Sequence, residues 1–118
     1  MPHMLLIHEP IGQRNTRDDA QGRAAYDQMV RWGKDLDRRG LLLAGEALAS
    51  HEHAARVTVS DGKARIVDGP FAEVKEMLGG FFLLNVENRD QAIALATECP
   101  AATYATVEVR PLAPCYMP

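Results

Sequence analysis

Asp68 is the residue of this sequence best placed for acid–base chemistry. Its carboxylate ends a strand-forming run, directly before Gly69 and Pro70. A carboxylate in apolar surroundings holds its proton more tightly, because burial disfavours the charged form, and this is how proteins prepare a general acid or base. Asp is equally suited to capping a helical turn through backbone N–H groups. Both roles stay open, and they are not exclusive.

The direction of Asp68 follows from the hairpin that precedes it. Asp61-Gly62 separates two strand-forming runs, 55–60 and 63–68, and is typical of a two-residue type I′ turn. With this turn, Val57 faces Ile66 and the apolar side chains gather on one side of the hairpin. Side chains alternate with period two, so Asp68 shares the face of Ile66. We expect it to point among apolar side chains, at the wall of a pocket.

Three further charged or titratable side chains are candidates for the same site. Glu46 follows the second apolar run, Lys75 follows the turn after Asp68, and His8 ends the first apolar run. In a small-molecule enzyme they would act as binding groups around Asp68. Each of these side chains is also a common surface residue.

Other site chemistries find little support in the sequence. His51-Glu52-His53 falls in an expected loop with no obvious third ligand, so no metal site is predicted. Ser50 and Ser60 lack the setting of a nucleophilic serine. Gly79-Gly80 leads into a strand, the reverse of a phosphate-binding loop. No cofactor is expected.

The elements that would position these residues follow the order β-α-β, hairpin, β-α-β. Two such crossings around one sheet, with helices on one side, describe a ferredoxin-like α+β sandwich with an extra hairpin. Outside the hairpin, strands are expected at 4–8, 41–44, 81–86 and 106–110, helices between Thr16 and Gly40 and between Asn88 and Pro100, and a short helical turn at 70–77.

The strand at 81–86 predicts a second copy of the chain. Alternate residues of Phe81-Phe82-Leu83-Leu84 point to opposite faces, and both faces are apolar. Helices on one side cover only one face, and each large side chain left in water costs about 1.5–3 kcal/mol. A symmetric homodimer that joins the uncovered faces is therefore expected.

Length and charge set the broad class. A chain of 118 residues suits a single domain over residues 1–118, and its net charge of −3 comes without a basic stripe. Direct binding to nucleic acid is therefore not expected. The N-terminal residues lack the features of a secretory signal, and no apolar run reaches transmembrane length, which predicts a cytoplasmic protein with no membrane contact.

The stretch VDGPFAEVKEMLGGFF, residues 67–82, resembles the DGPF-type branch of the YCII-related proteins. MLLIHE, GEAL and ATVEVRPL resemble other parts of that family, so the likeness extends along almost the whole chain. It implies a ferredoxin-like fold that pairs as a dimeric α/β barrel. It also implies a cleft beside Asp68, Gly69, Pro70 and Phe71, whose ligand is an unknown small molecule.

The resemblance leaves the activity open. Related proteins are suspected of pairing a histidine from the first helix with an aspartate, but residues 17–39 contain no histidine. An enzyme would have to use Asp68 with a different partner. The family also implies a functional link to sigma factors of the extracytoplasmic-function type. The alternatives are therefore a small-molecule enzyme, a ligand-sensing or regulatory module, and a dimer with a vestigial pocket.

Overall fold

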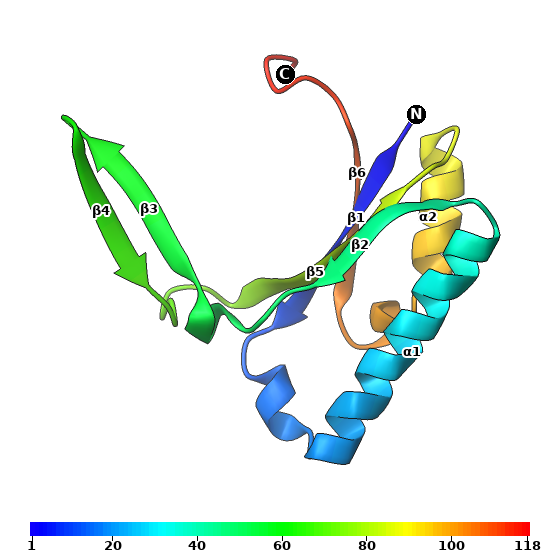
Figure 1. Cartoon of the computed structure of the whole chain (residues 1–118), viewed down its shortest axis with the longest axis horizontal. Coiled ribbons are helices and arrows are strands. Elements are labelled where there is room, and N and C mark those ends of the chain that lie inside the picture. Colours follow the sequence, from blue (N-terminus) through cyan, green and yellow to red (C-terminus); the bar gives the residue numbers. More distant parts are fainter.

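Four strands form one antiparallel sheet in the order β2-β5-β1-β6. The computed structural model describes residues 1–118. Its strands are β1 (His3–Pro10), β2 (Leu42–Ala47), β3 (Ala55–Ser60), β4 (Lys63–Asp68), β5 (Glu76–Leu84) and β6 (Thr106–Pro111), its α-helices are α1 (Asp19–Arg38) and α2 (Arg89–Glu98), and its short 3₁₀ turns are η1 (Gln13–Thr16), η2 (His51–His53) and η3 (Pro100–Thr103) (Figure 1). This α+β arrangement is compatible with a ferredoxin-like fold.

Both helices are fixed by local capping. The Asp18 side chain accepts a hydrogen bond from the Gln21 N–H, and the Gln21 amide oxygen accepts one from the Asp18 N–H. This capping box places the start of the helix two residues beyond Thr16, the expected limit. Gly40, with φ of 70°, follows the end of α1. Asn88 caps α2 by accepting from the Gln91 N–H, as expected.

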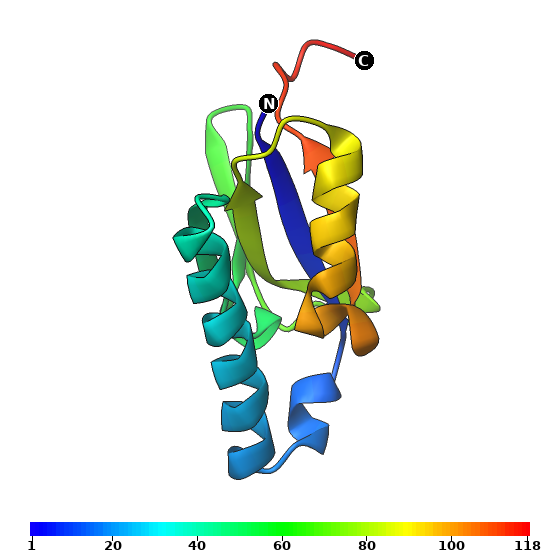
Figure 2. The same cartoon turned by 90° about the vertical axis from the view of Figure 1, so that its right-hand side faces the viewer.

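The helices cover only one face of the sheet (Figure 2). The core lies between them and this inner face, and its buried residues are Leu5, Leu36, Leu84, Val86, Ala92, Leu95 and Ala96. By strand alternation, the opposite or outer face presents Met4, Leu6, His8, Ala44, Glu46, Leu78, Phe81, Leu83, Thr106, Glu108 and Arg110. Its apolar centre is not covered within the chain, as the pattern at 81–84 predicts.

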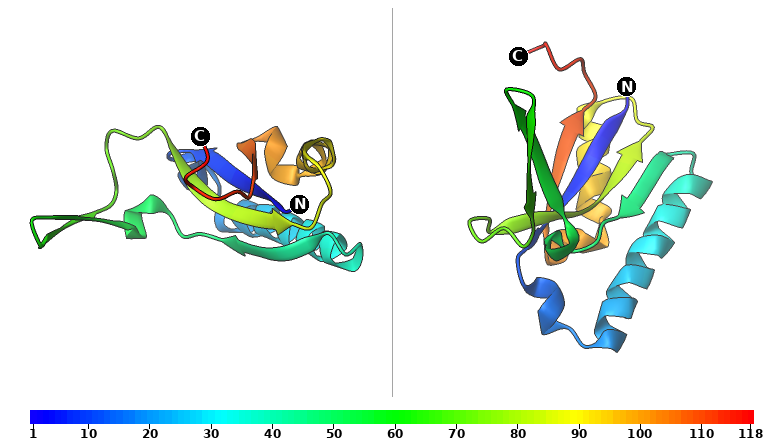
Figure 3. Two further views of the ribbon diagram at one scale, coloured as in Figure 1. Left: turned by 90° about the horizontal axis from the view of Figure 1, so that it is seen from above. Right: turned by 60° about the vertical axis from the view of Figure 1, so that its left-hand side comes forward.

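The hairpin β3–β4, residues 55–68, leaves the sheet as a separate arm. Its register pairs Val57 with Ile66 and Ala55 with Asp68, and Asp61 and Gly62 both have positive φ, so the hairpin prediction is confirmed. The arm stands on the side of the sheet away from the helices (Figures 1 and 3). All residues of both strands are exposed.

The helical turn expected at 70–77 is wrong. Only a turn forms there, in which the Val74 N–H donates to the Phe71 carbonyl, and Glu76 already begins β5. The physical reason is long-range pairing: Glu76 lies opposite Pro10 and Met77 opposite Glu9. These pairs extend β5 toward its N-terminus, and they override the local preference for a helix start after proline.

Candidate functional site

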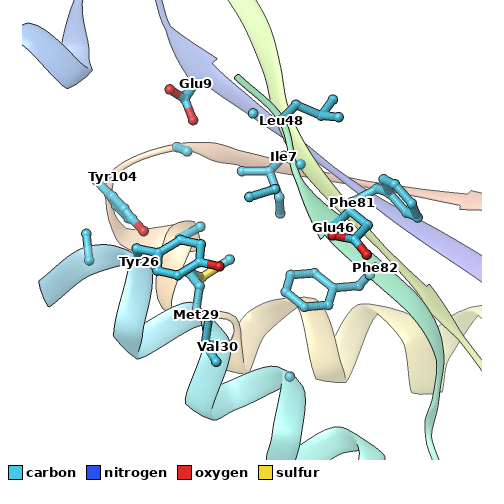
Figure 4. Close-up of a pocket in the computed structure, with 18 of the residues that line it drawn as sticks. Ile7, Glu9, Tyr26, Met29, Val30, Glu46, Leu48, Phe81, Phe82 and Tyr104 are labelled. Carbon is cyan, nitrogen blue, oxygen red and sulfur yellow. The ribbon is translucent and has the colours of Figure 1, made fainter. Parts of the chain in front are cut away.

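A cavity of about 560 Å³ lies between α1 and the inner face of the sheet (Figure 4). Turns η1 and η3 close one end of it, and its volume is typical of small-molecule sites. Ile7, Met29, Val30 and Phe82 supply apolar wall. Phe82 is held edge-on against Trp32, with ring centres 5.0 Å apart. The wall is thus mainly apolar and closely packed at Phe82.

Glycines bring α1 and β2 close to the ring of Phe82. A Cβ atom on Gly33 of α1 would lie 3.3 Å from Phe82 Cε1, and one on Gly45 of β2 would lie 3.0 Å from Phe82 Cδ1. Both distances are tighter than ordinary van der Waals contact. Larger residues at these positions would push the ring of Phe82 out of its place in the wall.

Glu9 and Arg14 form the strongest polar contact at the cavity. Arg14 Nε donates to Glu9 Oε1 at 2.6 Å and Arg14 Nη2 donates to Glu9 Oε2 at 3.2 Å. Only 12% of the Glu9 side chain is exposed. Gly79 makes room for the pair, because a Cβ atom there would overlap the Glu9 carboxylate. A bidentate guanidinium compensates the burial of this carboxylate and fixes its direction.

Tyr104 lies at the same end of the cavity (Figure 4). Burial raises the pKa of its phenol above the ordinary 10.0; Arg17 lowers it, and Cys99 and Glu9 add smaller increases. The Arg17 guanidinium lies 4.7 Å from the centre of the ring. The Gln13 side-chain amide donates to the Tyr104 carbonyl oxygen at 2.7 Å. Tyr104 is therefore a neutral hydrogen-bond donor at neutral pH.

The raised pKa of Tyr104 predicts a late tyrosinate titration. The folded state holds this proton to higher pH than the unfolded chain, so the contribution to stability is complete below about pH 10 and is lost as the pH rises through the folded pKa. In a spectrophotometric titration, one of the three tyrosines should ionise after the others. Tyr104→Phe should remove that last phase. Loss of an earlier phase instead would contradict the assignment.

Of the residues expected at the site from sequence, only Glu46 borders this cavity, at β2, and the register of β2 assigns its side chain to the outer face. His8 lies on the outer face, where its Nε2 is 2.6 Å from Glu108 Oε1. Lys75 is exposed in the connection before β5, and its carbonyl accepts a hydrogen bond from the Ile11 N–H. Gly69, Pro70 and Phe71 do not line the cavity either.

Asp68 is also away from the cavity. It is exposed, pairs with Ala55 at the base of the arm, and no helix follows for it to cap. The hairpin register assigns Asp68 to the same face as Ile66, as expected. That face has no neighbour within the chain, because the arm leaves the sheet instead of packing on it. The chain alone therefore gives Asp68 no apolar pocket.

The block from Gly69 to Phe71 anchors the arm. The Gly69 N–H donates to the Ala54 carbonyl at 2.8 Å, and a Cβ atom on Gly69 would overlap the carbonyl oxygen of His51. Phe71 is buried, its N–H donates to His51 Nδ1 at 3.3 Å, and the Arg56 guanidinium lies 3.9 Å from its ring centre. These contacts hold both ends of the arm together.

Sequence reasoning missed Glu9, Arg14 and Tyr104. One signal for Glu9 was available: Leu5, Ile7 and Glu9 alternate along β1, so the carboxylate continues a buried face. The expected strand stopped at His8, which assigned Glu9 to a loop. No comparable signal marked Arg14 or Tyr104, because η1 and η3 bring them to the cavity from distant parts of the chain.

Two further properties of the chain bear on the class of site. No group of three or more histidine, cysteine, aspartate or glutamate side chains lies close enough together to hold a metal ion. None of the helices combines the length and the apolar character that a membrane span requires.

The chain is a two-layer α+β protein with a cavity between α1 and the sheet. The model of the YCII-related domain matches residues 1–115, so the chain belongs to the YCII-related family. It is similar to the uncharacterized protein R00369 of Rhizobium meliloti (strain 1021), with 44% identity over 62 residues. That match covers 51% of this chain, and the chain spans 50% of the length of the relative.

Proposed function

We propose that this chain is a small-molecule-binding protein of the DGPF-type branch, with its binding site in the cavity between α1 and the sheet. The branch is supported by Asp68, Gly69, Pro70 and Phe71, which form the block that names it. The observation that carries the function is a mainly apolar cavity beside a half-buried, bidentate Glu9–Arg14 pair. Such a site combines apolar burial of a ligand with a few fixed polar groups.

The same cavity is suited to proton transfer. Glu9 supplies a fixed carboxylate, which accepts protons, and Tyr104 supplies a phenol, which donates them. If the protein is an enzyme, its reaction would use this pair on a bound small molecule. A role for Asp68 as general acid or base would require a second copy of the chain to cover it, because burial is what prepares a carboxylate for that work.

The alternative that we propose is a ligand-sensing or regulatory module with a functional link to an extracytoplasmic-function sigma factor. The arm favours it, since Val57, Val59 and Ile66 are 60%, 68% and 64% exposed and form an apolar surface of the kind that partners cover. A pull-down from the source cell that recovers no transcription protein would count against this alternative.

For either function we propose a cytoplasmic location, which agrees with two cysteines that are free rather than paired.

We also propose that the working unit is a homodimer, in which two outer faces meet to form an α/β barrel. Met4, Leu6, Phe81 and Leu83 form the apolar centre of the outer face and are only half-covered by their own chain. A second copy is the occupant we propose, because it carries the same apolar face and a two-fold axis joins the two.

The arm supports this assembly through interface size. The four short strands present only every second side chain to the outer face. A standard protein–protein interface uses roughly 20–30 residues a side, so the outer face alone is smaller than that. The two arm strands add six residues each. The arm stands on the side of the outer face, so the second copy would also cover it (Figure 3). A two-stranded hairpin is marginal alone in water, and such cover would stabilise it.

Thermal-shift screening with a metabolite library tests the binding function. A ligand at a hundred times its Kd should stabilise the wild type by about 2.7 kcal/mol. Ala25→Trp, on the cavity face of α1, should abolish that shift by filling the space. Val59→Ser, on the arm, should leave it unchanged and serves as the control. A ligand that stabilises Ala25→Trp as well as wild type would place binding outside the cavity.

A further inference from the structure

We infer that the ligand of this cavity carries an anionic group bound by Arg17, and an apolar body that lies between α1 and Phe82. This inference rests on the proposed binding function and adds the chemical class of the ligand. It follows from which charged side chains at the η1 end of the cavity already form ion pairs and which do not.

Arg17 is the cation without an acidic partner at that end. Arg14 is held by Glu9, and Arg23 forms an ion pair with Asp19 at 2.9 Å. Arg17 is half-buried, forms no ion pair or side-chain hydrogen bond, and only stacks on the ring of Tyr104. A guanidinium carries five N–H donors in a planar fork that fits a carboxylate, sulfonate or phosphate. The stacking holds this fork in place before a ligand arrives.

Neighbouring acids do not take up this charge. Asp19 is used by Arg23, and Asp18 accepts the capping hydrogen bond of α1. The Glu9 carboxylate is compensated by Arg14. Three arginines and three carboxylates thus share the η1 end of the cavity, and Arg17 is the one arginine there without an ion pair, so its guanidinium is the group free to bind an anion.

The rest of the cavity selects an apolar body. Ile7, Met29 and Phe82 flank the space beyond Tyr104, and about 560 Å³ is far more than an inorganic anion fills. Lys34 lines the cavity farther along α1 and is exposed. Lys34 is the other cation that could bind an anionic group. It lies 15 residues beyond Asp19, the first residue of α1, which is roughly 22 Å along the helix axis from the η1 end of the cavity. A small aromatic or branched organic acid fits this arrangement, because its acid group can bind the half-buried Arg17 while its apolar body lies against the apolar wall.

Two fluorescent probes of similar shape test this inference. Anilinonaphthalene sulfonate is an apolar aromatic anion, and N-phenylnaphthylamine is its neutral counterpart. Arg17→Gln should weaken binding of the anionic probe about tenfold or more, because it removes a charge-assisted contact, and should change binding of the neutral probe less than about twofold. Arg23→Gln, a matched change outside the cavity, should change neither. Fluorescence titration of the wild type and of both variants measures all six affinities.

Each other outcome has a definite meaning. Anionic-probe binding that survives Arg17→Gln, or that Lys34→Gln weakens instead, overturns the assignment of Arg17. Equal loss of both probes overturns the charge argument. Probe binding that persists in Ala25→Trp, and in the milder Ala25→Leu if the first variant fails to fold, places the probes outside the cavity. That last result contradicts the proposed binding site itself, whereas the first two leave it standing.

Discussion

Gly69→Ala is expected to destabilise the protein by about 2–3 kcal/mol and to loosen the arm. The added methyl group would overlap the carbonyl oxygen of His51. The carbonyl oxygen belongs to the backbone and the position of a Cβ atom is fixed by the backbone, so no side-chain rotation relieves the overlap, and either η2 or the base of β4 must move. Overpacking of this kind costs about 1–3 kcal/mol. The melting temperature should fall by roughly 5–15 °C, and protease should cut residues 55–68 faster than in the wild type.

Gly22→Ala is the matched control for Gly69→Ala. Gly22 lies within α1, and a Cβ atom there meets nothing within 4 Å. Alanine is preferred over glycine inside a helix by about 0.5–1 kcal/mol, so this variant should be slightly more stable than the wild type. If Gly69→Ala melts like the wild type and its arm resists protease equally, the packing of Gly69 against His51 does not anchor the arm.

The sequence predicted well those features that depend on neighbouring residues. Asp61-Gly62 sets the hairpin register, because only a two-residue turn with positive φ at both positions joins these strands in that way. Asn88 caps α2 by the same local logic. The apolar alternation of 81–84 indicated two apolar faces, and the helices cover only one of them.

Features that depend on distant contacts were predicted poorly. A proline followed by helix-forming residues favoured a helix at 70–77, but pairing of Glu76 and Met77 with β1 made that segment strand. The register of the hairpin gave the face of Asp68 but not the surroundings of that face. Those depend on where the arm points, which is set by contacts of Phe71 with His51 and Arg56. No local pattern records such contacts.

The same limit explains why the cavity was missed. Its polar end is assembled from the end of β1, from η1 and from η3, which lie almost a hundred positions apart in the chain, as the Gln13–Tyr104 contact illustrates. Proximity of this kind is a property of the sheet order, in which β1 lies between β5 and β6. Residue spacing predicted the fold class, and the fold class brought these residues together.

Leu83→Asp is expected to convert the proposed dimer to a monomer. Leu83 lies opposite Met4 on the outer face, with Phe81 two positions before it on the same strand. In the proposed dimer an aspartate here would bury an unpaired carboxylate in each copy, which costs several kcal/mol and raises the Kd of the dimer by a factor of about a thousand or more. Analytical ultracentrifugation at micromolar concentration should show a wild-type dimer and a Leu83→Asp monomer.

The folded state of one chain should survive this substitution, because Leu83 is only half-buried within its own chain. Circular dichroism should therefore show the same helix and strand content for both proteins. Ile93→Asp is the control: Ile93 lies on α2, is 36% exposed and is far from the outer face, so it should stay dimeric. A wild type that sediments as a monomer, or a Leu83→Asp variant that remains a dimer, would mean that the outer face is not the contact between copies. The apolar centre formed by Met4, Leu6 and Phe81 would then need a different partner, since the helices of its own chain lie on the other side of the sheet.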